Sequence, residues 1–122
     1  MKRSEFLVYS LAVFLGTSLG GLLRLATVQS PIETTWGLLL VNALGSGVVG
    51  FLAAAALSGR WRAFLATGVC GGFTSFSLLS LQSAVFVERS EVFIGLAYML
   101  FTVVVSVLAV WIGHSFGRKV LT

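Results

Sequence analysis

Four apolar stretches, separated by short polar segments, dominate this 122-residue chain. They cover residues 6–25, 36–57, 63–87 and 92–113, and Arg24 at the end of the first stretch is the one charged residue within them. About 20 apolar residues are enough for a helix to cross a hydrocarbon core of about 30 Å. We therefore expect an all-α integral membrane protein in which residues 1–122 form a single four-span domain.

The composition excludes a soluble domain of this size, because 57% of the residues are hydrophobic, only 10% are charged and the mean hydropathy is +1.03. The first stretch is about twice as long as the apolar core of a signal peptide and has no convincing cleavage site, so we interpret it as a retained span. The net charge of +4 comes from short flanks and loops. Membrane lipid headgroups explain these cations better than nucleic acid does.

The basic residues are distributed unevenly between the two ends of the predicted spans. An even number of spans places both termini on one side, together with the loop between the second and third spans. Six basic residues lie on that side and two on the other: Lys2, Arg3, Arg60, Arg62, Arg118 and Lys119 against Arg24 and Arg89. The positive-inside rule therefore predicts a multi-pass protein of the cell membrane with both termini in the cytoplasm.

The third stretch contains the run GVCGGFTSFS at residues 68–77, which places a glycine pair and several hydroxyls at bilayer depth. We expect this span to break near Gly71 and Gly72 into two half-helices, whose free carbonyls can coordinate a cation.

Four short helices can hardly enclose a polar pathway, so we also expect an oligomer. Small residues at four-residue spacing suit close helix contacts, either between subunits or within one chain; they are Gly16 and Gly20, Ser46 and Gly50, and Gly68 and Gly72.

Neutral polar residues remain as candidates for function, because the centres of the spans carry no Asp, Glu, Lys, Arg or His. This pattern argues against a proton-coupled carrier, and the absence of a credible nucleophile and base pair argues against an enzyme. Asn42 is the most costly of these residues to bury, and Tyr98, Thr102 and Ser106 share one helical face. They could line an ion pathway or merely join helices. The ring edge of Phe76 could attract an anion or simply pack.

Three motifs resemble the fluoride channel family called Fluc or CrcB: GGLLR at residues 20–24, GLLLVNALGS at 37–46 and GVCGGFTSFS at 68–77. The resemblance implies an antiparallel, dual-topology dimer with a broken third helix, two fluoride pathways and a central sodium ion that is structural and not transported. It assigns the backbone carbonyls of Gly71 and Thr74 to sodium. It assigns the fluoride pathway to Asn42, Phe76, Ser77, Tyr98, Thr102 and Ser106.

The chain departs from the family pattern at Leu38, where a threonine is expected, and at Leu79, where a second pore phenylalanine is expected. Gln82 stands where a glutamate is common. Leucine offers neither a hydroxyl donor nor a polarised ring edge. Together with the charge bias, these departures lead to the hypothesis that the chain is one half of a heterodimer with an oppositely oriented paralogue. A homodimer with altered pores stays open.

Two other functions are compatible with a chain of this kind. A small multidrug-resistance-type transporter has similar length and four spans, but it relies on a glutamate embedded in its first span, whereas Glu5 precedes the apolar core here. A non-transporting membrane assembly subunit would use the polar residues only to join helices.

Overall fold

The computed structural model of the chain describes residues 2–27 and 31–121, and the side chains of the second range from residue 35 onward. The described residues form helices without any strand: α1 (Arg3–Thr27), α2 (Pro31–Ala54), α3 (Gly59–Arg62), the π-helical η1 (Ala63–Cys70), α4 (Gly71–Phe73), α5 (Phe76–Glu88) and α6 (Val92–Leu121). The helix α2 begins at Pro31, well before its apolar stretch, because proline suits the first position of a helix.

Four helical segments are long and apolar enough to cross a membrane: Arg3–Thr27, Thr35–Ala54, Gly59–Glu88 and Val92–Leu121. The expected all-α, four-span fold is therefore confirmed. The third segment comprises α3, η1, α4 and α5, so the expected broken helix is also present. The break lies at Thr74 and Ser75, whereas Gly71 and Gly72 remain helical.

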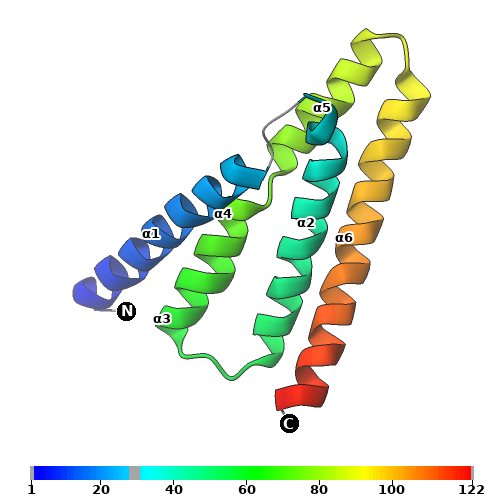
Figure 1. The fold of residues 1–122 in the computed structure, drawn as a ribbon. Coiled ribbons are helices and arrows are strands. Elements are labelled where there is room, and N and C mark those ends of the chain that lie inside the picture. Colours follow the sequence, from blue (N-terminus) through cyan, green and yellow to red (C-terminus); the bar gives the residue numbers. More distant parts are fainter. Residues whose placement is uncertain (1, 28–30, 122) are drawn as a thin grey trace.

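The helices pair along their lengths (Figure 1): α2 packs against α6, and α1 packs against η1 and α4. Both termini lie at the same end of the bundle as the connection between α2 and α3. The turn between α5 and α6 forms the opposite end, where Ser90 adopts a positive φ of 63° and Glu91 N–H donates to the Phe86 carbonyl at 2.9 Å.

Glycines allow the helix backbones to approach closely within the chain. A Cβ atom at Gly16 would meet the Phe64 carbonyl oxygen, one at Gly20 would meet that of Val69, and one at Gly72 would meet that of Thr17. Two of the small-residue pairs seen in the sequence therefore face each other across the contact between α1 and the third span. The structure thus uses them for packing inside one chain, the second of the two roles left open for them.

The adjacent glycines of α4 give a direct test of this packing. We expect Gly72→Ala to lower the free energy of unfolding by about 1–3 kcal/mol, because the added methyl group overlaps the backbone of α1. Gly71→Ala is the matched control, since a Cβ there has no neighbour within 4 Å. It should leave stability unchanged or raise it, because alanine favours the helix. Thermal unfolding in detergent measures both variants, and equal destabilisation would contradict the packing role.

Candidate functional site at the break in the third span

The helix is interrupted by two residues in extended conformation. Thr74 has φ −79° and ψ 157°, and Ser75 has φ −150° and ψ 110°, after which α5 begins at Phe76. The Ser75 hydroxyl caps α5 by accepting a hydrogen bond from Leu78 N–H at 3.1 Å. Serine is a preferred N-cap residue because its oxygen satisfies one of the free N–H groups of the first turn. The serine thus starts a new helix three residues after the glycine pair at which the sequence predicts the break.

Asn42 on α2 holds this break open. Ser75 N–H donates to Asn42 Oδ1 at 2.8 Å, and Asn42 Nδ2 donates to the Ser75 carbonyl at 3.3 Å. The side chain is only 7% exposed. In a continuous helix the Ser75 N–H would bond to the Gly71 carbonyl. Because this N–H instead binds Asn42, the Gly71 carbonyl loses its usual helical partner.

Arg24 on α1 reaches the same break from the other side. Its Nη1 donates to the Thr74 carbonyl oxygen at 3.2 Å, and the residue is half-buried. The Cys70 carbonyl accepts from both Thr74 N–H, at 2.9 Å, and Thr74 Oγ1, at 3.0 Å. A cation next to the carbonyl end of a helix is favourable, because that end carries partial negative charge. The site predicted from the sequence does not include Arg24. Its position as the only charged residue inside an apolar stretch is a signal that could have indicated it.

A polar hollow of about 360 Å³ opens on the surface beside the break. It is lined by Thr17, Gly21, Arg24, Gly71, Gly72, Thr74, Ser75, Phe76 and Ser77. Phe76 and Ser77 are exposed here, with 67% of Phe76 accessible. The structure therefore brings together Gly71, Thr74, Phe76 and Ser77 around one hollow, and Asn42 lies behind it.

The remaining predicted residues lie on α6, away from the lining of this hollow. Tyr98 and Thr102 are buried, and Ser106 is half-buried. The Tyr98 hydroxyl donates to the Thr35 carbonyl at 2.8 Å, and the Thr102 hydroxyl donates to the Tyr98 carbonyl at 2.8 Å. Both hydroxyl protons are thus bound to backbone oxygens in this structure.

The two residues that depart from the family pattern occupy one layer between the polar groups. Leu38 is 0% exposed and Leu79 is 2% exposed, and both belong to a single buried cluster with Tyr98. Leu38 lies one turn before Asn42 on α2, and Leu79 lies one turn after Ser75 on α5. In the next layer, Gln82 Nε2 donates to Thr35 Oγ1 at 2.8 Å. The contact between α2 and α5 is therefore polar at Asn42, apolar at Leu38 and Leu79, and polar again at Gln82.

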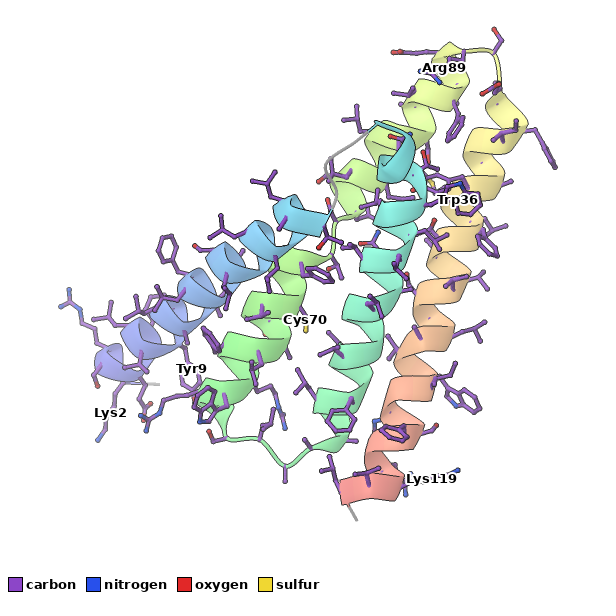
Figure 2. All side chains as sticks on the ribbon, viewed as in Figure 1. Lys2, Tyr9, Trp36, Cys70, Arg89 and Lys119 are labelled. Carbon is purple, nitrogen blue, oxygen red and sulfur yellow. The ribbon has the colours of Figure 1, made fainter. Side chains whose placement is uncertain are left out.

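These features define the chain as a multi-pass membrane protein built around an interrupted third span (Figure 2). An unpaired backbone group costs several kcal/mol in hydrocarbon, so a break of this kind occurs where protein or a water-filled cavity replaces lipid. The partners of Thr74 and Ser75 are Arg24 and Asn42.

Comparison with known proteins identifies the family. The model of the family described as "CrcB-like protein, Camphor Resistance (CrcB)" matches residues 11–114. The chain is 38% identical over 121 residues to "Fluoride-specific ion channel FluC" of Granulibacter bethesdensis, covering 91% of this chain and 95% of that relative. It is 40% identical over 116 residues to the protein of the same name from Thermus thermophilus, covering 88% of this chain and 91% of that relative. The chain therefore belongs to the CrcB-like family, as its three motifs indicated.

The break should depend on the Asn42 amide. We expect Asn42→Ala to lower the free energy of unfolding by about 1–3 kcal/mol, because the buried N–H and carbonyl of Ser75 lose their partner. It should also speed hydrogen exchange at Ser75. Thermal unfolding and hydrogen–deuterium exchange in detergent measure these effects. Ser46→Ala, one turn further along α2, is the control, and an equal response in the two variants would show that Asn42 does not hold the break.

Proposed function

We propose that this chain is a subunit of a fluoride-selective channel through which fluoride leaves the cytoplasm passively, so that its concentration there falls. The observation that carries the proposal is the interrupted third span, which is held by Asn42 and opens onto a polar hollow. The relatives named as fluoride-specific ion channels support fluoride as the ion.

Fluoride is small and strongly hydrated, so its pathway must offer hydrogen-bond donors in place of water. We assign this role first to Asn42, whose Nδ2 donates to the Ser75 carbonyl over a long 3.3 Å and has a second proton to give. Phe76 and Ser77 lie beside the hollow, where a ring edge and a hydroxyl can face an anion. Tyr98, Thr102 and Ser106 form the second part of the pathway. The Tyr98 and Thr102 hydroxyls must leave their present carbonyl partners before they donate to fluoride.

One chain leaves this pathway open on one side, which supports a dimer. The hollow lies at the surface, and most of the Phe76 ring is accessible. An anion at this position would meet lipid, in which it cannot be solvated. We propose that a second subunit in antiparallel orientation closes the hollow.

We propose further that the Gly71 and Thr74 carbonyls hold a structural sodium ion that is not transported. The residues fit this role, since Ser75 N–H is diverted from the Gly71 carbonyl to Asn42 and Gly71 lines the hollow. The Thr74 carbonyl accepts from Arg24, so the guanidinium must give up this bond or share the oxygen with the ion. Two carbonyls are too few to replace the water around a cation, and the same two groups of a second subunit would complete the set.

Two observations support a heterodimer with an oppositely oriented paralogue. Leu38 and Leu79 close the layer between Asn42 and Gln82 with apolar side chains packed around Tyr98. This layer contains no donor for fluoride other than the Tyr98 hydroxyl. The charge bias also favours a heterodimer, because six basic residues lie on the side of the two termini and two, Arg24 and Arg89, on the other. A strong bias favours one orientation, whereas an antiparallel homodimer needs both.

One observation favours a non-transporting assembly subunit as the second candidate function. Asn42 already makes two hydrogen bonds that join α2 to the third span, which is a purely structural task. Fluoride flux distinguishes this function from the channel.

Reconstitution in liposomes tests the proposed function. With this chain alone we expect slow fluoride efflux, measured with a fluoride electrode. Addition of a related four-span chain of opposite charge bias, carrying phenylalanine at the position of Leu79, should give fast efflux that excludes chloride. Fast efflux from this chain alone would contradict the heterodimer proposal and support the channel proposal. The absence of fluoride flux in every combination would contradict the channel itself.

Restoration of the family residues tests the apolar layer. We expect the double variant Leu38→Thr with Leu79→Phe to speed fluoride efflux by the chain alone about tenfold, roughly 1.4 kcal/mol of barrier and within the range of one hydrogen bond. The smaller threonine makes room for the larger phenylalanine, which limits overpacking. Leu38→Thr with Leu78→Phe is the control, because Leu78 is a half-buried neighbour of the same cluster. An equal effect of both double variants would contradict a specific ring at residue 79.

A further inference from the structure

A second depression, separate from the polar hollow, runs between α1 and the start of the third span. It has a volume of about 490 Å³ and is almost entirely apolar. Its lining consists of Val8, Leu11, Ala12 and Leu15 on α1 and of Arg60, Trp61 and Phe64 on α3 and η1. We call it the α1–α3 groove.

Helix α1 forms one wall of the α1–α3 groove, and α3 with η1 forms the other. The four residues of α1 recur at the spacing of one helical face. On the opposite wall, the rings of Trp61 and Phe64 meet edge to face, with centroids 6.1 Å apart and an interplanar angle of 82°. At the same end, Gly59 packs so closely on the Tyr9 ring that a side chain there would collide with it. Figure 2 shows Tyr9 beside the start of the third span.

One end of the groove is positively charged. Arg60 lines it and is exposed, and none of the hydrogen bonds between described side chains involves its guanidinium. The start of α1, with Arg3, and helix α3, with Arg62, lie at the same end of the bundle (Figure 1), and Lys2 lies there as well (Figure 2). The carboxylate nearest to this cluster in sequence is Glu5, which accepts from Lys2 N–H at 3.1 Å. Trp61 is 60% exposed, as expected for an aromatic ring at the headgroup level of a membrane.

The groove lies on the opposite side of α1 from the polar hollow. Residues advance by about 100° along a helix with 3.6 residues per turn. Relative to the Gly16 and Gly20 stripe that contacts the third span, Val8 and Leu15 therefore point to one side. Thr17 and Gly21, which line the hollow, point to the other. A subunit that covers the hollow thus leaves the groove facing lipid.

We propose that the α1–α3 groove binds an anionic phospholipid, with an acyl chain between α1 and η1 and the headgroup phosphate on Arg60. The groove matches the two parts of such a lipid, because it is apolar along its length and cationic at the end that lies at the membrane surface. Arginine binds phosphate through two parallel hydrogen bonds. This site is independent of fluoride conduction and is formed by other residues.

Native mass spectrometry of the purified full chain tests the proposal with phosphatidylglycerol and phosphatidylcholine added in equal amounts. We expect Arg60→Gln to reduce phosphatidylglycerol binding about fivefold, the effect of one basic residue at a membrane surface. Phosphatidylcholine binding should fall less, because the choline cation offsets the charge of its phosphate. Arg62→Gln, on the same short helix and outside the groove, should change binding less than twofold. Equal losses in both variants would show diffuse attraction by charge and overturn the site.

A second pair of variants tests the apolar part without changing charge. Ala12→Phe fills the groove and should reduce the binding of both lipids, whereas Ala84→Phe on the exposed face of α5 should leave it unchanged. Unchanged lipid binding in Ala12→Phe would overturn the proposal. Loss of the dimer in this variant, with lipid binding retained, would assign the groove to a second copy of the chain and would also overturn it.

Discussion

The double hydrogen bond between Asn42 and Ser75 is the interaction on which the rest of the structure depends. Hydrocarbon offers no partner to a free backbone group, so a helix can open at bilayer depth only where another part of the protein binds the exposed N–H and carbonyl. The Asn42 amide supplies both an acceptor and a donor to one residue. The extended backbone at Thr74 and Ser75, the loss of the usual helical partner of the Gly71 carbonyl and the polar hollow all follow from this pairing.

Further pairs of facing residues follow at intervals of one turn along the contact between α2 and α5. Asn42 meets Ser75, Leu38 meets Leu79 within one buried cluster, and Thr35 meets Gln82. Polar layers on both sides of an apolar layer can bind an ion without letting water through, but an ion must still cross the middle. The departures from the family pattern fall together in that middle layer. In the channel that we propose, they would affect one step of the pathway and leave the break unaltered.

Close helix crossings occur within the chain itself, so the proposed second subunit would have to bind another surface. Gly16, Gly20 and Gly72 bring the backbone of α1 against the third span, and Gly50 does the same for α2 and α6. A helix face used in this way is no longer available to a second subunit. The hollow at the break is the polar surface that a single chain leaves uncovered at bilayer depth. It is thus the face that a partner must cover if an ion is to pass there.

The sequence by itself determined the four spans, the broken third helix and the family, because hydropathy over some 20 residues and a polar run inside an apolar stretch are local signals. Only the tertiary structure decided where the break falls. Gly71 and Gly72 stay helical, with Gly72 packed against α1. The backbone opens at Ser75 because Asn42, distant in sequence, binds it there. The contact of Arg24 with Thr74 and the shared layer of Leu38 and Leu79 likewise join residues from different helices. Such contacts depend on how the helices pack, which no single span encodes.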